Sequence, residues 1–164
     1  MSSIVKVHWD SQLPIYEISH LKLKNKGIKS LLIDVDGTLL SRQSTVIPEN
    51  VKSWIKESKK FFSLYLISNN PSEDRIRKIA MELDLRYKSN AQKPRKKITL
   101  NVISETHDDL KNIAIIGDRI FTDIIVGNRC NIQTILVKRL NRKGLPIKLN
   151  LTLLLEKIIS YFLK

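Results

Sequence analysis

Apolar runs alternate along the chain with segments in which apolar residues recur three or four positions apart. The runs are typical of buried strands and predict five of them, at about 31–35, 62–67, 86–89, 112–116 and 132–137. The strand at 86–89 has the weakest signal. The segments with helical spacing predict helices at about 48–60, 71–83, 93–104, 120–129 and 150–163.

Strands that alternate with helices at this rhythm predict an α/β fold, in which right-handed crossovers connect parallel strands and helices cover both faces of the sheet. We therefore expect a Rossmann-like three-layer sandwich with a mainly parallel five-stranded sheet. Its 164 residues, 42% of them hydrophobic, suit a single domain, 1–164. Within it, 1–29 would form an N-terminal arm and 150–164 a C-terminal amphipathic helix.

Charge and composition limit the partners and the cellular compartment that we expect for the protein. A net charge of +13 favours anionic partners, namely phosphate substrates, lipid surfaces or nucleic acid. Few aromatic residues lie among the basic ones to stack on bases, which argues against nucleic acid. The chain shows neither a signal peptide nor an apolar run of about 18 residues, and its one cysteine, Cys130, fits a reducing compartment. We expect a cytoplasmic protein and leave open a peripheral contact with a membrane.

Two carboxylates and a glycine directly follow the first predicted strand. Asp34 and Asp36 would face the same way on a continuing strand, and Gly37 supplies a turn that separates them. Two like charges near 4 Å repel by roughly 4 kcal/mol at an effective dielectric of about 20, so this pair needs a bound cation or a shared proton. Taken alone, the motif fits an Asp-Gly hairpin turn with incidental acids equally well.

Polar residues also occur where other predicted strands end. Ser68 follows the strand at 62–67, Asp118 follows the strand at 112–116, and Lys93 precedes a helix. Ligands of parallel α/β sheets bind outside the carboxyl ends of the strands. We therefore expect these side chains to meet the two acids of the first strand in one pocket.

The acids provide candidates for the hydrolysis of a phosphate monoester. Asp34 would attack phosphorus to form an aspartyl phosphate, and Asp36 would protonate the leaving oxygen and then activate water. Mg²⁺ prefers oxygen ligands, and it would be held by Asp34 and Asp118 with help from Asp123 and the backbone carbonyl of Asp36.

The phosphate group itself needs hydrogen-bond donors and a positive charge. Ser68 and the backbone of Asn69 would donate hydrogen bonds to its oxygens, and Lys93 would neutralise the charge of the pentacoordinate state. Without the cation, the acids would repel a phosphate dianion.

The order of these residues resembles that of the haloacid dehalogenase (HAD) superfamily, whose phosphatases use an aspartate nucleophile. The matching motifs are Asp34-Val35-Asp36-Gly37-Thr38, Ser68, Lys93, and Gly117-Asp118 with Asp123. Longer stretches resemble the YqeG-type branch of subfamily IIIA, which is similar to phosphatidylglycerophosphate phosphatases; they include 66–70, 91–94 and 116–123. The resemblance implies a magnesium-dependent phosphatase with phosphatidylglycerophosphate as its substrate.

Many phosphatases of this superfamily carry a cap domain between these motifs. Here the predicted helices and strands fill both intervening segments, so we expect no large cap and an open cleft. Such a cleft suits a substrate attached to something large, or a homo-oligomer in which another subunit covers it.

A lipid-linked phosphomonoester would fit an open cleft. A basic stretch at 138–148 precedes a helical face that would suit an anionic membrane, although a helix packed on the sheet has the same periodicity. The residues of this face are Leu151, Leu154, Leu155, Ile158 and Phe162.

Two other functions remain open from the sequence. One is a HAD phosphatase that acts on a soluble sugar phosphate or a nucleic-acid end. The other is a non-catalytic basic module that binds RNA or membranes on the same fold. The complete set of acids argues against this module, because a protein without catalysis has no physical reason to gather them.

Overall fold

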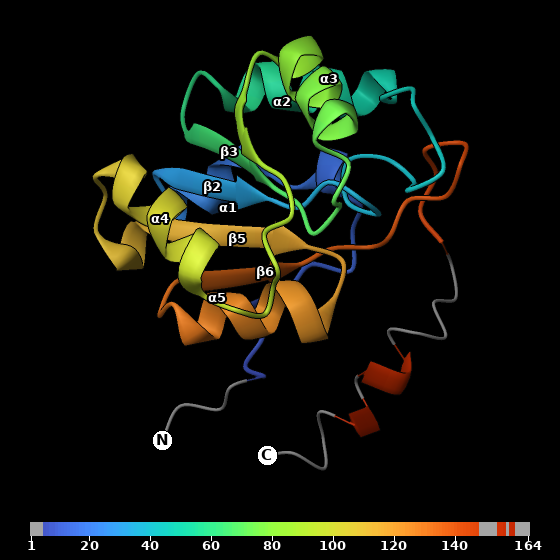
Figure 1. Cartoon of the computed structure of the whole chain (residues 1–164). Helices are drawn as coiled ribbons and strands as arrows, with labels where there is room; N and C mark the ends of the chain where they lie inside the picture. The colour runs from blue at the N-terminus through green and yellow to red at the C-terminus, as the bar shows by residue number, and fades with distance from the viewer. Residues whose placement is uncertain (1–4, 148–153, 157, 160–164) are drawn as a thin grey trace.

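The computed structural model describes residues 5–147, 154–156 and 158–159. Parallel strands form one sheet in the order β1-β6-β5-β2-β3-β4. The strands β3, β2, β5 and β6 lie side by side in Figure 1. Their bounds are β1 Trp9–Asp10, β2 Ser30–Ile33, β3 Ser63–Ile67, β4 Arg86–Lys88, β5 Ile113–Gly117 and β6 Gln133–Leu136.

Helices connect these strands. The α-helices are α1 His20–Asn25, α2 Glu49–Ser58, α3 Glu73–Leu83, α4 Lys97–Thr106 and α5 Ile125–Arg129. Two short 3-10 helices precede α1 and β5, at Ile15–Glu17 and Leu110–Asn112, and a π-helical turn, Ile120–Ile124, leads directly into α5.

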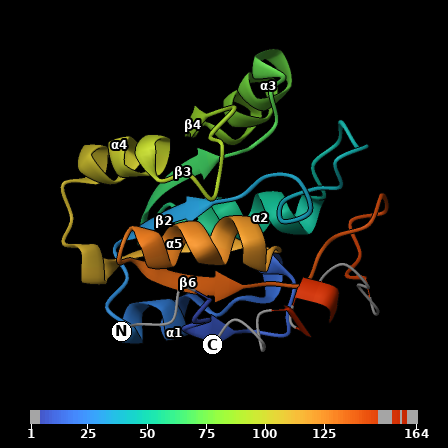
Figure 2. The same cartoon turned by 60° about the horizontal axis from the view of Figure 1, so that its bottom comes forward.

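Alternate residues of the central strands belong to two different cores. In β2, Leu31 and Ile33 pack with residues of α1, α2 and α3, whereas Leu32 packs with residues of α4 and α5. Strands β3 and β5 alternate in the same way. In Figure 2, α5 passes in front of the strands and α2 lies behind them. Because both faces are covered, the central strands β2, β3 and β5 are apolar over most of their length, and the predicted three-layer α/β sandwich is confirmed.

The sheet has six strands rather than the five predicted. The additional strand β1 comes from the N-terminal arm, where Trp9 pairs with Ile135 of β6. The backbone N–H of His8 supports this edge by donating to Thr134 Oγ1 at 3.1 Å. A strand of two residues is too short to show an alternating pattern, so the sequence gives no signal for it.

Two helices begin later than predicted. The helix α3 begins at Glu73 rather than at residue 71, because Ser72 is its N-cap and accepts a hydrogen bond from the backbone N–H of Arg75. The helix α4 begins at Lys97 rather than at residue 93, after a turn that precedes it. The residues before each helix therefore lie at the carboxyl ends of the strands.

No cap domain interrupts the chain between the predicted motifs. From Asp34 to Ser68 the chain forms a loop, α2 and β3, and from Ser68 to Lys93 it forms α3 and β4. The expected absence of a large cap is confirmed for these segments, which the structure describes in full.

The predicted C-terminal helix is described only at 154–156 and 158–159, which are helical. Glu156 is buried, and its carboxylate accepts a hydrogen bond of 2.8 Å from the backbone N–H of Ile120. The described part of the predicted apolar face is exposed by 47–59%, at Leu154, Leu155 and Ile158. The other residues of that face, Leu151 and Phe162, lie outside the described residues. Among the helices that are described, none has the length and apolar character to cross a membrane.

Candidate active site

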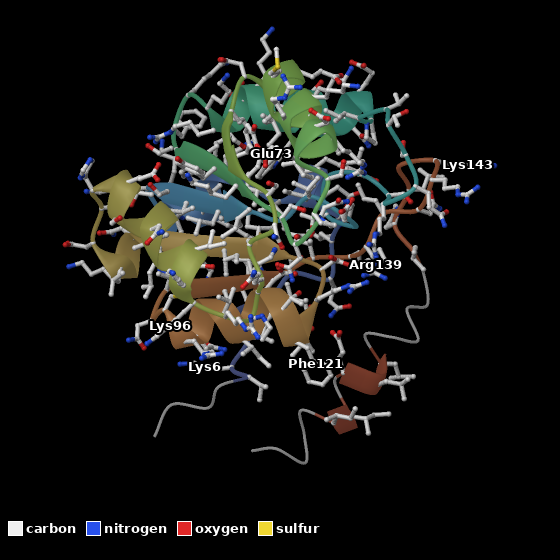
Figure 3. All side chains as sticks on the ribbon, in the orientation of Figure 1. Lys6, Glu73, Lys96, Phe121, Arg139 and Lys143 are labelled. Carbon is white, nitrogen blue, oxygen red and sulfur yellow. The ribbon has the colours of Figure 1, made fainter. Side chains whose placement is uncertain are left out.

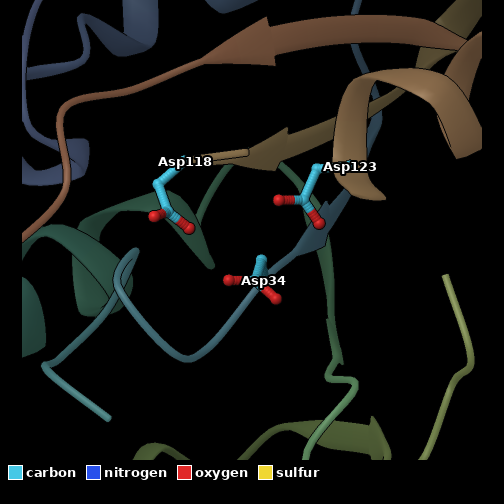
Figure 4. Close-up of side chains that lie close together, drawn as sticks. All are labelled: Asp34, Asp118 and Asp123. Carbon is cyan, nitrogen blue, oxygen red and sulfur yellow. The ribbon is translucent and has the colours of Figure 1, made fainter. Parts of the chain in front are cut away.

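Three buried carboxylates from separate parts of the chain converge at the carboxyl edge of the sheet (Figure 4). Asp34 follows β2, Asp118 follows β5, and Asp123 lies in the π-helical turn. Each contributes one oxygen atom to a group in which all these atoms lie within 4.8 Å of one another. Asp118 Oδ1 is buried and has no hydrogen-bond partner among the described residues. Buried oxygen donors at this spacing fit a hard divalent cation such as Mg²⁺.

Strand register brings these acids together. Ile33 of β2 pairs with Ile116 of β5, and the backbone N–H of Asp34 donates to the Ile116 carbonyl at 2.9 Å. The next residues of both strands therefore emerge at one point. Gly117 is required there, because a Cβ atom on it would lie 2.3 Å from Cγ of Asp123.

Lys93 joins the nucleophile candidate to this group. Its side chain is buried, and its ammonium donates three hydrogen bonds, to Asp34 Oδ1 at 2.7 Å, Asp123 Oδ1 at 2.6 Å and the Ile67 carbonyl at 2.8 Å. Burial by itself lowers the pKa of Lys93, but the Asp123 and Asp34 carboxylates raise this pKa above its usual value. The lysine is therefore charged.

The pKa values of the acids are raised. Burial raises the pKa of Asp34 to about 8, with Lys93 lowering it and Asp123 and Asp118 raising it further. Burial also raises the pKa of Asp118 to about 6, with Asp123 adding to the rise and Arg139 opposing it. These shifts mean that the ionised acids repel one another, which a bound cation would relieve.

Asp36 lies in a separate set of contacts. Its Oδ1 atom is 2.8 Å from Arg75 Nη1, and its Oδ2 atom accepts a hydrogen bond of 2.8 Å from Asn70 Nδ2. Arg75 also donates to the Ser44 carbonyl at 3.1 Å. The Asp36 carboxylate is outside the three-carboxylate group, and the metal contact expected from its backbone carbonyl stays a prediction.

A cavity of about 540 Å³ opens beside these residues. The residues predicted to carry the chemistry and to bind phosphate line it together: Asp34, Asp36, Ser68, Asn69 and Lys93. Asp34 belongs both to this cavity and to the group with Asp118 and Asp123, so the structure brings all the predicted site residues to one place.

Asn69 has a role that the sequence did not show. The expected donation from its backbone to phosphate stays a prediction, and its side chain also holds the backbone of Lys93. Asn69 Nδ2 donates to the Lys93 carbonyl at 2.8 Å, and Asn69 Oδ1 accepts from the Lys93 N–H at 2.7 Å. This pair of bonds fixes the lysine opposite the end of β3.

Four further residues of the site were missed, and the first is Asn70, whose side chain donates to Asp36 Oδ2. Thr38 donates to Asp34 Oδ2 at 3.3 Å, and its place in the Asp-x-Asp-Gly-Thr motif is a signal that could have found it. Arg75 on α3 and Arg139 after β6 pair with Asp36 and Asp118. No local pattern marks these arginines, because their partners are distant in the sequence.

Comparison with known proteins places the chain in a family. Residues 3–140 match the sequence model of the family described as mitochondrial PGP phosphatase. The chain is 28% identical over 123 residues to the probable phosphatase YqeG of Bacillus subtilis (strain 168), which covers 75% of this chain and 72% of that protein. It is 26% identical over 163 residues to phosphatidylglycerophosphate phosphatase 1, chloroplastic/mitochondrial, of Arabidopsis thaliana, which covers 89% of this chain and 47% of that protein.

The fold also agrees with solved structures. A HAD-hydrolase from Bacillus subtilis, YfnB, determined with bound magnesium, matches with a TM-score of 0.53 and 14% identity, over 65% of this chain and 85% of that chain. This likeness shows a shared fold. The family match over residues 3–140 establishes that the chain is a phosphatase of the mitochondrial PGP phosphatase family, and its fold is shared with a HAD-hydrolase.

Proposed function

We propose that this phosphatase removes the terminal phosphate of phosphatidylglycerophosphate, with Asp34 as the nucleophile and Mg²⁺ as the cofactor. The observation that carries the proposal is the position of Asp34, which lines the open cavity and also belongs to the group of buried carboxylates. The family match and the Arabidopsis relative support the choice of substrate. A soluble sugar phosphate or a nucleic-acid end is the alternative that the test below must separate.

The contacts of Asp34 suit a nucleophile. Its Oδ1 atom is held by Lys93, whereas Oδ2 accepts, from the described residues, only a long hydrogen bond of 3.3 Å from Thr38. Oδ2 therefore keeps lone pairs for attack on phosphorus, while Lys93 and Thr38 fix the orientation of the carboxylate. Bound Mg²⁺ would supply positive charge that lets a phosphate dianion approach the acids.

The contacts of Asp36 suit the transfer of a proton. Arg75 and Asn70 hold its carboxylate at the cavity wall, two residues beyond the nucleophile. From there Asp36 would give a proton to the departing alkoxide and later take one from the attacking water. Ser68 is buried at the end of β3, and its Oγ atom accepts a hydrogen bond from the Asn70 N–H at 3.1 Å, which leaves the hydroxyl proton for a phosphate oxygen.

A phosphate-release assay on the purified full chain tests the proposal. The substrates are phosphatidylglycerophosphate in detergent micelles, a hexose phosphate and a 5′-phosphorylated oligonucleotide, each with Mg²⁺ and with EDTA. We expect release from the lipid with Mg²⁺, loss of release with EDTA, and a drop of about 10³-fold or more in kcat for Asp34→Asn.

The matched control is Asp109→Asn, which changes an exposed acid before β5, at the opposite end of that strand from Asp118, and should keep full activity. Equal activity of Asp34→Asn and the parent protein would refute the assignment of Asp34 as the nucleophile. A clear preference for the hexose phosphate or the oligonucleotide would refute the lipid substrate.

A further inference from the structure

Four arginines from three separate segments line the cavity that holds the phosphate-binding residues: Arg42, Arg119, Arg139 and Arg142. Arg139 is paired with Asp118. Within the described part of the chain, no carboxylate lies within 4.0 Å of the guanidinium nitrogens of the other three. Counting Lys93, the cavity lining has five basic residues against two acids, Asp34 and Asp36.

Backbone contacts fix these arginines around one opening. The segment 139–147 folds back on itself, with the Ile147 N–H donating to the Arg139 carbonyl at 2.8 Å. The Leu140 N–H donates to the Gly37 carbonyl at 2.8 Å, which attaches this segment to the loop that carries Asp36. Figure 3 shows Arg139 at the inner end of the segment and Lys143 at its outer tip.

A side-chain contact joins this segment to the loop on the other side of the opening. Arg142 Nε donates to Gln43 Oε1, and Gln43 follows Arg42 directly in the chain. Both arginines and Gln43 line the same cavity. Arg42 and Arg142 therefore lie on two joined segments at the same cavity. Such a placement differs from that of the scattered lysines on an ordinary solvated surface.

The reacting phosphate does not need these charges. Ser68 is placed to bind a monoester beside the charged Lys93, and the charge of Arg139 is used by Asp118. Among the described residues, the guanidinium groups of Arg42, Arg119 and Arg142 form no ion pair within 4.0 Å, although the charge of Arg119 lowers the pKa values of Asp118 and Glu156 against the rise that burial causes. Guanidinium groups bind phosphate oxygens in a bidentate manner, so a cavity with three of them suits a second phosphate group.

We propose that Arg42, Arg119 and Arg142 form a second anion subsite, which binds a phosphodiester carried by the same substrate molecule. The preferred substrates are then phosphomonoesters with a phosphodiester a few bonds away, and compounds with a monoester alone bind weakly. This inference rests on the proposed function, because the monoester must occupy the pocket at Asp34. The diester can belong to a lipid or to its free head group, since the arginines contact only the phosphate.

The test compares three substrates: phosphatidylglycerophosphate in micelles, its water-soluble deacylated head group, and glycerol 3-phosphate, which lacks the diester. The variants are Arg42→Gln/Arg142→Gln and the control Lys143→Gln, an exposed lysine of the same segment outside the cavity lining. We expect kcat/KM for the head group to exceed that for glycerol 3-phosphate by about tenfold or more. The double variant should abolish this preference by raising KM for the head group. Lys143→Gln should keep the preference for the head group.

Two results would overturn the subsite. In the first, the double variant lowers kcat/KM equally for all three substrates. In the second, it lowers kcat/KM for the micellar lipid and not for the head group, which would mean that the arginines contact a lipid surface rather than the diester.

Calorimetry separates the subsite from the catalytic proposal. With Mg²⁺ present, Asp34→Asn protein should bind the head group about tenfold more tightly than glycerol 3-phosphate, and adding the two arginine substitutions should abolish the difference. Equal affinities for the two ligands would refute the subsite. If the parent protein turned over none of the substrates while this difference in affinity remained, the proposed activity would be refuted and the subsite would stand.

Discussion

The ammonium group of Lys93 connects the end of β3 with the acids that follow β2 and β5. Its three hydrogen bonds use all of its donors, and each partner comes from a different element. A lysine with this arrangement holds Asp34 and Asp123 at a fixed separation. Besides strand register, the position of the acids in the candidate site therefore depends on one residue that lies outside the strands.

Gly117 permits the approach of Asp123, and its substitution tests the carboxylate group. In Gly117→Ala, the added Cβ would lie 2.3 Å from Asp123 Cγ and would displace that carboxylate. We expect a loss of about 1–3 kcal/mol in the free energy of unfolding, because this site has no room for an added methyl group. The rise in Tm on adding Mg²⁺ should disappear, and kcat should fall about 100-fold.

Gly27→Ala is the control for backbone strain. Gly27 has a φ of +72°, but the nearest atom to its added Cβ is Asn112 Nδ2 at 3.4 Å, far from the site. This variant should lose stability and keep the Tm response to Mg²⁺. An unchanged Mg²⁺ response in Gly117→Ala would contradict the assignment of Asp123.

Single residues differ in how far the sequence predicts them. Asp34, Ser68 and Asp118 directly follow apolar runs, so the pattern alone locates them at strand ends. Arg75 and Arg139 make contacts just as close, but with partners 39 and 21 residues away in the numbering. Local patterns carry no information about such pairs, which exist only after the elements have packed.

At the scale of elements, α3 connects the general-acid candidate with the loop at the cavity mouth. Arg75 contacts Asp36 and donates to the carbonyls of Ser44 and Ser41. Asn70, just before this helix, holds the other oxygen of Asp36. The helix therefore positions Asp36 without contacting the reacting atoms itself.

Removing this contact should affect turnover more than binding. In Arg75→Gln, we expect kcat to fall about tenfold, because Asp36 loses its fixed orientation, while KM and Tm change little. Arg75→Lys should recover part of the rate. The control Arg77→Gln removes an exposed arginine of the same helix that forms an ion pair with Asp74, and it should have no effect on kcat. Loss of Tm without loss of kcat would show that Arg75 is only structural.

The elements that the sequence predicted best are those buried on both faces. The apolar runs of β2, β3 and β5 stand out because both cores contact them. The starts of α3 and α4 were predicted too early, since Pro71 and Pro94 both read as first helical residues whereas the chain first forms turns at the strand ends. Strand β1 gains its stability from pairing with β6, which no local signal records.

At the scale of the whole molecule, the buried acids make stability depend on pH and on the cation. The folded pKa values of Asp118, about 6, and Asp34, about 8, lie above the values expected in an unfolded chain. The folded state therefore binds protons more tightly, and this stabilisation is lost as pH rises through the folded values. With EDTA, we expect Tm to fall as pH rises from about 5 to about 8.5, and Mg²⁺ should reduce the fall.

The same measurement on Asp118→Asn identifies the acid responsible. This variant should lose the part of the decrease near pH 6, because it removes that carboxylate and its repulsion with Asp123. If Tm of the metal-free parent protein stayed constant or rose over this range, the carboxylates would not be in the close arrangement described here.

The most direct measurement for the central claim is the location of the phosphoryl group during turnover. The protein is mixed with substrate and Mg²⁺, quenched, and reduced with borohydride, which converts an aspartyl phosphate to homoserine. Peptide mass spectrometry should find homoserine at position 34, in the peptide covering 30–42, and nowhere else. Phosphate release without any modification at Asp34, or modification at Asp36 or Asp123 instead, would contradict the account.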